Sequence, residues 1–112
     1  MKKDDGIYLS HILESLDQVL EYTKGLSREE FYGNRVVQDA VIRQLEIVGE
    51  ATKNISPDFR NKYTNIPWKK MAGMRDKLIH DYFGVDIDAV WDTAKRDVAE
   101  LRRTLSEITP TK

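Results

Sequence analysis

The sequence is organised around the segment Arg75-Asp76-Lys77-Leu78-Ile79-His80-Asp81-Tyr82-Phe83-Gly84. It contains one of the two histidines of the chain, with an arginine five residues before it and a tyrosine two residues after it. Gly84 is typical of a helix end, because glycine tolerates the left-handed backbone conformation that follows the last helical turn. The sequence on either side of this segment predicts helices, which we expect to act as a scaffold that holds it in place.

Three long helices are predicted from apolar residues that recur every three or four positions. The first spans 5–24 and ends at Gly25; the second spans 35–54 and is capped by Asn34; the third spans about 87–108. The predicted buried stripes are Ile7, Leu9, Ile12, Leu13, Leu16, Val19 and Leu20 in the first helix, Val36, Val37, Ala40, Val41, Leu45, Val48 and Thr52 in the second, and Ile87, Val90, Trp91, Ala94, Val98, Leu101, Leu105 and Ile108 in the third.

Short helices are predicted between the long ones from their capping residues. The sequence from Ser27 to Glu30 is a capping box, in which a serine hydroxyl and a glutamate side chain bond each other's backbone N–H groups. Ser56 followed by a proline starts a short helix that ends near Tyr63. A further helix is predicted to start with Pro67 as its first residue, to carry the motif at its C-terminal end and to stop at Gly84.

The second long helix also carries a charged face, formed by Asp39, Arg43, Glu46 and Glu50. We expect Asp39 to pair with Arg43, and Arg43 to pair with Glu46, since side chains three or four residues apart are neighbours on a helix. Such carboxylates can act in acid–base catalysis or bind a cation. The alternative is that they form a row of ordinary ion pairs. Gly49 interrupts the helix, which predicts close packing of another helix at that point.

Composition predicts a single all-α domain over residues 1–112, an up-and-down bundle of three long helices and one or two short ones. The chain has no cysteine, which excludes disulfides and thiolate metal sites and suits a reducing cytoplasm. No secretory signal and no apolar run of about 20 residues is present, so we expect a cytoplasmic protein without a membrane contact. The apolar stripes exceed what one small bundle needs, which favours a homodimer.

Positive charge is concentrated just before and within the motif. Six cations and two anions lie between Asp58 and Lys77, although the whole chain carries a formal net charge of −1. Such a segment suits a polyanion such as RNA, and Lys69, Lys70 and Lys77 would attract its backbone. The alternative is an ordinary solvated face of long basic side chains.

Arg75 and His80 supply the two kinds of group that RNA cleavage without a metal requires. A histidine can transfer protons near neutral pH, and an arginine can bind two phosphate oxygens without losing its charge. On a straight helix the two side chains lie about 140° apart, so one helix does not bring them together. A site formed across a two-fold axis would bring the two groups together, with Asp76 orienting the imidazole. Alternatively, Arg75 pairs with Glu46 or Glu50 and His80 only ends a helix.

The motif and its surroundings resemble the HepT-like branch of the HEPN (higher eukaryotes and prokaryotes nucleotide-binding) superfamily. The resemblance lies in Ile66-Pro67-Trp68, in Gly73 to Asp86, in Val90-Trp91 and in the segment from Ile42 to Asn54. Proteins of this branch carry an arginine, a polar residue, a histidine four to six residues after the arginine, and then a tyrosine. Arg75, Asp76, His80 and Tyr82 match these positions.

This resemblance implies an all-helical homodimer in which the two motifs meet in a cleft. It implies a metal-independent endoribonuclease toxin, without a cofactor, of a toxin–antitoxin pair resembling types II and VII. The implied partner is an MNT-type nucleotidyltransferase, which would neutralise the toxin by transferring AMP to Tyr82. The alternative is a subunit that does not cut RNA, but dimerises and binds a nucleotide or the nucleotidyltransferase.

Overall fold

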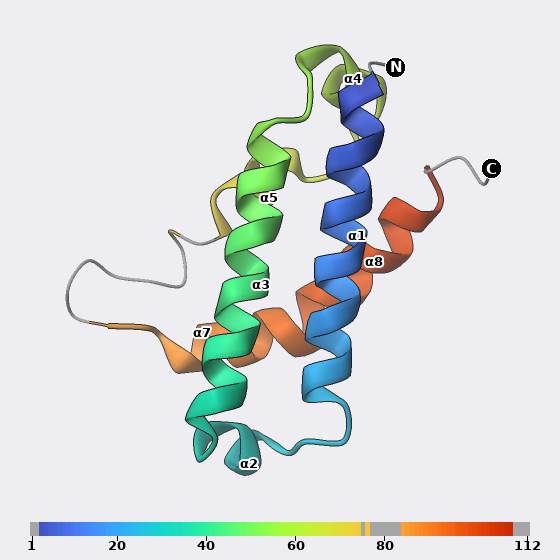
Figure 1. The fold of residues 1–112 in the computed structure, drawn as a ribbon. Helices are drawn as coiled ribbons and strands as arrows, with labels where there is room; N and C mark the ends of the chain where they lie inside the picture. Colours follow the sequence, from blue (N-terminus) through green and yellow to red (C-terminus); the bar gives the residue numbers. More distant parts are fainter. Residues whose placement is uncertain (1–2, 75, 77–83, 109–112) are drawn as a thin grey trace.

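The computed structural model describes residues 3–74, 76 and 84–108, and every regular element in that part of the chain is helical (Figure 1). The prediction of an all-α chain is therefore confirmed. None of the described helices is long and apolar enough to cross a membrane. The elements are α1 Lys3–Thr23, α2 Arg28–Tyr32, α3 Arg35–Lys53, α4 Pro57–Lys62, α5 Trp68–Ala72, α7 Ile87–Asp92, the π-helical η1 Thr93–Asp97, and α8 Val98–Ser106.

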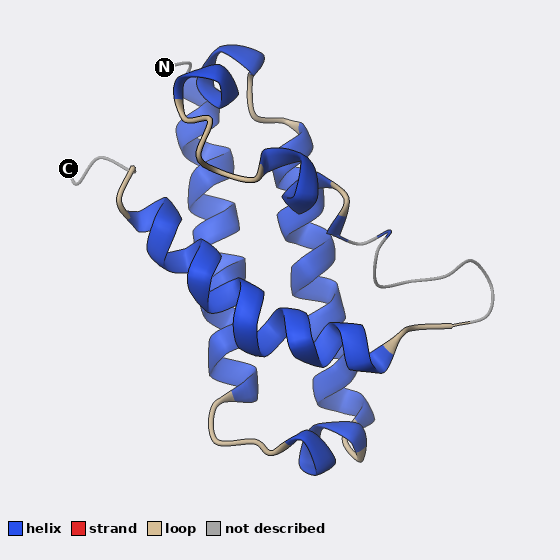
Figure 2. Cartoon of the chain, turned by 180° about the vertical axis from the view of Figure 1, so that it is seen from behind, coloured by secondary structure: helices blue, strands red, loops and turns tan. Residues whose placement is uncertain are grey.

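Two layers of helices form the fold. Helices α1 and α3 run antiparallel, side by side, and α7, η1 and α8 form one continuous helical run that lies obliquely across both of them (Figure 2). The third long helix therefore crosses the other two, whereas an up-and-down bundle would place it alongside them. Helix α5 packs against α3.

The core lies where these layers meet. Phe31 of α2 packs against Trp91 of α7 in a tilted arrangement, with ring centroids 5.0 Å apart. Burial of each large apolar side chain contributes roughly 1.5–3 kcal/mol, so this layer of side chains is the main source of stability. The buried residues predicted from the stripes include Leu9, Ile12, Leu16 and Val19 of α1, Val41, Leu45 and Val48 of α3, and Val90, Trp91, Ala94, Val98, Leu101 and Leu105 of the crossing helix.

Two members of the predicted stripes are wrong, because their side chains face solvent. Val36 is 78% exposed and Ile7 is 49% exposed. Val36 precedes Val41 by five residues, which on a helix places it about 140° away from the core-facing direction. Asp39 was predicted to pair with Arg43, but its Oδ1 atom instead lies 3.2 Å from Nε of Arg35. The predicted pair of Arg43 with Glu46 does form, with Nη1 of Arg43 3.7 Å from Oε1 of Glu46.

Local capping residues start the helices as predicted. Ser27 and Glu30 form the capping box of α2, and the side chain of Asn34 accepts a hydrogen bond from the backbone N–H of Val37. Gly25 follows α1 with φ +76°, a backbone conformation that is unfavourable for residues with a side chain.

Two predicted helices differ from the structure. The helix predicted from Pro67 to Gly84 is interrupted, because α5 ends at Ala72 and Gly73 is its C-cap; Pro67 is the N-cap residue rather than the first helical one. The third long helix contains the π-helical turn η1. Lys95 in this turn donates to the carbonyl of Thr23 at 3.2 Å and lies over the ring of Trp91.

A buried carboxylate joins α1 to the start of α4. Asp5 is 1% exposed, and it accepts hydrogen bonds from the backbone N–H of Ser56 at 2.8 Å and from its hydroxyl at 2.7 Å. The same hydroxyl accepts from the N–H of Phe59 and so caps α4. The carboxylate therefore fixes the orientation of the hydroxyl that starts this helix.

Asp5→Ala is expected to lower the free energy of unfolding by about 1–3 kcal/mol, because the buried N–H and O–H groups of Ser56 lose their acceptor. Asp4, its exposed neighbour in the same turn, provides the control variant Asp4→Ala. Urea denaturation of the two variants measures the difference. Equal stabilities would contradict the role given to the Asp5 carboxylate.

Candidate functional site

The predicted motif lies between α5 and α7, and the structure describes Asp76 and Gly84 of it. Asp76 is helical and exposed, and Gly84 has φ +103°, a backbone conformation that favours glycine over residues with a side chain. The described residues next to the motif define how the chain enters and leaves it. The other predicted site residues of the motif lie outside the described part of the chain: Arg75, Lys77, His80 and Tyr82.

The entry side of the motif is fixed by a close contact between two backbones. A Cβ atom at Gly49 of α3 would lie 3.2 Å from the carbonyl oxygen of Ala72 and 3.4 Å from that of Met71. The close packing predicted at Gly49 is thus confirmed, and its partner is the last turn of α5. Met71 is fully buried and Met74 is 2% exposed, so the chain remains packed against the core up to the start of the motif.

Helix α5 is also held at its first residue and along its exposed side. The indole N–H of Trp68 donates to the carbonyl of Tyr63 at 2.9 Å, as expected for a buried tryptophan. Nζ of Lys70 lies 3.6 Å from a carboxylate oxygen of Asp97 in η1. Together with the contact at Gly49, these interactions connect α5 to α3, to the loop before it and to the crossing helix.

The predicted phosphate-attracting lysines differ in their surroundings. Lys69 and Lys70 are both exposed on α5, four and five positions after Asn65. The ammonium group of Lys70 is paired with the carboxylate of Asp97. A pair of this kind near the surface contributes at most about 1 kcal/mol to stability. Lys69 is therefore better placed than Lys70 to attract a polyanion, because a nearby carboxylate partly neutralises the charge of Lys70.

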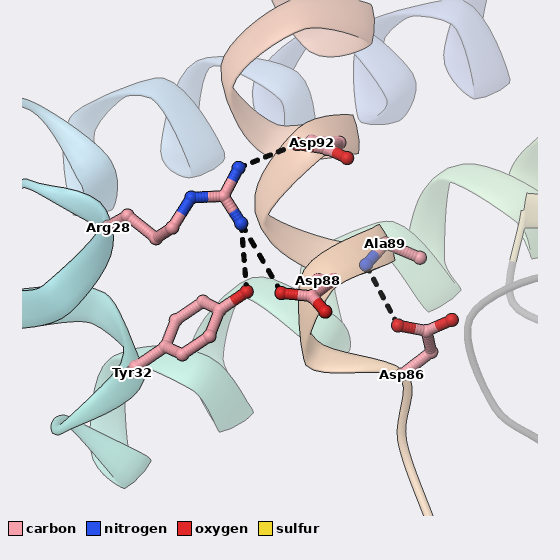
Figure 3. Close-up of polar contacts among 6 residues, drawn as sticks. All are labelled: Arg28, Tyr32, Asp86, Asp88, Ala89 and Asp92. Atoms are coloured by element: carbon pink, nitrogen blue, oxygen red, sulfur yellow. Dashed lines mark hydrogen bonds and ion pairs between the residues drawn. The ribbon is translucent and has the colours of Figure 1, made fainter.

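The exit side of the motif lies beside a hollow on the same helix α3. Gly84, Val85 and Ile87 form a hollow of about 290 Å³ with α3, whose lining there is Arg35, Gln38, Asp39 and Ile42. The carboxylate of Asp86 accepts a hydrogen bond from the N–H of Ala89 at 3.0 Å and caps α7 (Figure 3). The chain therefore returns from the motif directly into a capped helix.

A guanidinium group connects α2 to the start of α7. Arg28 lies 3.3 Å from Asp88 and 3.4 Å from Asp92, two residues on adjacent turns of α7, and donates to the hydroxyl of Tyr32 at 2.9 Å (Figure 3). This cluster is not predictable from the sequence, because Asp88 and Asp92 follow Arg28 by 60 and 64 residues and the residues around Arg28 indicate only a capping box.

A second hollow, of about 400 Å³, is lined by residues of α1 and α3 and by Asn54. It includes His11, whose ring meets Tyr8 edge-on at 6.5 Å, together with Arg43, Glu46 and Glu50. Within residues 3–74, 76 and 84–108, no group of three His, Asp or Glu side chains is arranged to hold a metal ion.

Comparison with known proteins relates this arrangement to a family. The family model described as "Ribonuclease HepT-like" matches residues 12–108, which include the whole motif. A protein of Methanocaldococcus jannaschii named "Putative RNase" is 48% identical over 107 residues, which cover 96% of this chain and 88% of that protein. The "Probable ribonuclease HepT" of Thermococcus cleftensis is 47% identical over 102 residues, which cover 91% of this chain and 93% of that protein.

One relative is considerably longer. The "Gamma-glutamylcyclotransferase and putative RNase" of Methanocaldococcus jannaschii is 49% identical over 108 residues, and the chain spans 49% of its length. No solved structure matches the chain significantly. The family model covers most of the helical scaffold as well as the motif that the scaffold presents. The chain therefore belongs to the ribonuclease HepT-like family.

Proposed function

We propose that this protein is a metal-independent endoribonuclease, the toxin of a toxin–antitoxin pair. The observation that carries the proposal is the family match across residues 12–108, because it includes the Arg75–Tyr82 motif together with the helices on both sides. Relatives that share nearly half of their residues with this chain over more than nine tenths of its length bear RNase names. The exposed lysines of α5 support an RNA substrate, since they lie directly before the motif.

The proposed mechanism assigns one task to each motif residue. Arg75 binds the scissile phosphate and stabilises the negative charge that develops on it during attack by the 2′-hydroxyl. His80 transfers protons, taking one from the 2′-hydroxyl or giving one to the departing 5′-oxygen. Asp76 orients the imidazole. Because both proton transfers require a group of this kind and the motif has one histidine, the active unit is a homodimer with the two motifs facing each other.

Lys69, Lys70 and Lys77 attract the RNA backbone in this proposal. Lys70 would do so less strongly than Lys69, because of its contact with Asp97. A partner nucleotidyltransferase of the MNT type would transfer AMP from ATP to the hydroxyl of Tyr82, with release of pyrophosphate. The added nucleoside and its negative phosphodiester would compete with RNA for the cationic motif. After co-expression with such a partner, mass spectrometry is expected to find AMP on the peptide that contains Tyr82, and an unmodified peptide would contradict this role.

The activity can be tested on purified protein with RNA in the presence of EDTA. Fragments that end in 2′,3′-cyclic phosphate are expected, because attack by the neighbouring 2′-hydroxyl leaves this product and requires no metal. Protein that binds its nucleotidyltransferase but leaves RNA intact with and without Mg²⁺ would replace the proposal by the alternative, a non-catalytic binding subunit. Cleavage that EDTA abolishes would contradict metal independence alone.

A further inference from the structure

Charge is distributed unevenly between the helices. Residues 53–74, which lead into the motif, include five basic side chains and one acidic side chain. Helix α1 has five acidic side chains and one lysine. A polyanion is therefore attracted to α4, to α5 and to the turn between them, and is repelled by α1.

Two lysines of this basic stretch are free to bind a ligand. Arg60 donates to a backbone carbonyl of α3 at 2.7 Å, and Nζ of Lys70 lies 3.6 Å from a carboxylate oxygen of η1. Lys62 and Lys69 are exposed, and no carboxylate within residues 3–74, 76 and 84–108 forms an ion pair with either of them. Their ammonium groups are therefore able to bind phosphate oxygens.

An aromatic side chain between these two lysines in the sequence is held firmly in place. The ring of Tyr63 packs against that of Phe59 with centroids 4.9 Å apart, and Phe59 packs against Trp68 at 6.0 Å. The indole N–H of Trp68 donates to the carbonyl of Tyr63 at 2.9 Å. Phe59 and Trp68 are buried, whereas Tyr63 is half-buried. Tyr63 is therefore the member of this cluster that solvent reaches, and it is attached to the first residue of α5.

The ring of Tyr63 has a cation above it. Nζ of Lys62 lies over the ring, 5.7 Å from its centroid. Because the lysine side chain is long, flexible and exposed, its ammonium group can move from the ring to a phosphate, and a nucleobase can take its place on the ring. A base stacks on an aromatic side chain only when it is not enclosed in a duplex, which indicates single-stranded RNA.

We propose that Tyr63, Lys62 and Lys69 form a subsite for single-stranded RNA, separate from the motif that cleaves it. This inference rests on the proposed function. A base of the substrate stacks on Tyr63, and the phosphates on either side of it contact the two lysines. Helix α5 runs from Trp68 to Ala72, so the subsite lies about 6–8 Å along the helix axis from the end of α5, where the chain leads into the motif. The substrate is therefore an RNA with an unpaired stretch beside the cleaved bond.

Binding of a fluorescent 2′-O-methyl RNA oligonucleotide tests the subsite, because this RNA lacks the attacking 2′-hydroxyl and is not cleaved. In fluorescence anisotropy, Tyr63→Leu is expected to raise the Kd for the single strand by about 5- to 100-fold, the range found when a stacked base loses its aromatic partner. Tyr63→Phe keeps the ring and is expected to bind like the wild type. The duplex of the same sequence is expected to respond little to Tyr63→Leu.

Lys62→Gln tests the phosphate contact separately. The slope of log Kd against log salt concentration is expected to become shallower by about 0.7, the value for one phosphate contact on a single strand. Lys24→Gln is the matched control, since Lys24 is an exposed lysine just after α1, and is expected to leave the slope unchanged. Because Lys62 is exposed, this variant tests the subsite even if Tyr63→Leu destabilises the fold.

Wild-type affinity in both Tyr63→Leu and Lys62→Gln would overturn the subsite. A loss confined to Lys62→Gln, in folded Tyr63→Leu protein that binds normally, would also overturn it, because general attraction of a polyanion needs no aromatic ring. In either case, cleavage of RNA by the wild type would leave the proposed function intact. Wild-type protein that binds the single strand through Tyr63 but does not cleave RNA would contradict the proposed function alone. Wild-type protein that neither binds the oligonucleotide nor cleaves RNA would contradict both.

Discussion

His80→Ala is expected to reduce single-turnover cleavage of RNA by about 100- to 10,000-fold, the range over which positioned acid–base groups act. The proposal gives this side chain both proton transfers in each pair of motifs, and alanine can perform neither. RNA binding is expected to change little, because the arginine and the lysines that attract the phosphates remain. Rates follow from gel analysis of a labelled RNA with enzyme in excess, and affinities from its fluorescence anisotropy.

His11→Ala is the matched control for this experiment. His11, the other histidine of the chain, is exposed on α1 and contacts Tyr8. Its loss is expected to leave the rate of cleavage unchanged. Equal rates for His80→Ala and the wild type would exclude His80 from the reaction, even if the protein cleaves RNA.

Gly49→Val is expected to lower the free energy of unfolding by about 1–3 kcal/mol, as overpacked sites do, and to impair RNA cleavage. A Cβ at this position would lie 3.2 Å from the carbonyl oxygen of Ala72, and that oxygen belongs to backbone that cannot rotate away. Helix α5 must therefore move away from α3, and the entry of the motif moves with it. Chemical denaturation and the cleavage assay measure the two effects on the same preparation.

Gly49→Ala and Gly33→Val complete the series. Alanine favours a helix interior by about 1 kcal/mol over glycine, so Gly49→Ala is expected to lose little stability while still shifting α5. A Cβ at Gly33 would make only an ordinary contact, 3.6 Å from the carbonyl oxygen of Glu29, and Gly33→Val is expected to retain activity. If Gly49→Val kept both wild-type stability and wild-type cleavage, α3 would not determine the position of α5.

The helices could be predicted because their signals are local. The caps formed by Ser27, Asn34, Ser56 and Asp86 each involve a residue three positions away, and the apolar repeat of each long helix is complete within it. The contact at Gly49 was also predictable, since a glycine inside a strong helix requires a reason. Its partner was not, because Ala72 is far away in the sequence.

The features that escaped prediction depend on tertiary contacts. The π-helical turn η1 is supported by Lys95, whose partner Thr23 lies 72 residues earlier. Arg28 connects α2 to α7 across 60 residues of sequence, and its local surroundings give no sign of this. Gly73 did carry a local signal, but the apolar repeat that continues past it favoured one unbroken helix. Val36 differs from the prediction for another reason. It is apolar and lies next to the buried stripe of α3, but its angle around the helix axis points it towards solvent.

The candidate site was predicted from residue chemistry and from a resemblance, and the family match supports the resemblance. The described residues add what the sequence did not contain, namely that the last turn of α5, just before the motif, packs closely on α3 at Gly49.

Mixing the wild type with an inactive variant tests most directly whether the active unit needs the His80 side chains of both protomers. Equal amounts of wild-type and His80→Ala protein are unfolded together, refolded as a mixture and assayed on RNA. Random pairing makes about a quarter of the dimers fully wild type and about half of them mixed; if the site needs both histidines, only the wild-type dimers cleave, and activity should be about a quarter of that of the same amount of wild-type protein. Activity of about one half, with mixed dimers present by native mass spectrometry, would show protomers that act independently and would contradict a site shared between them.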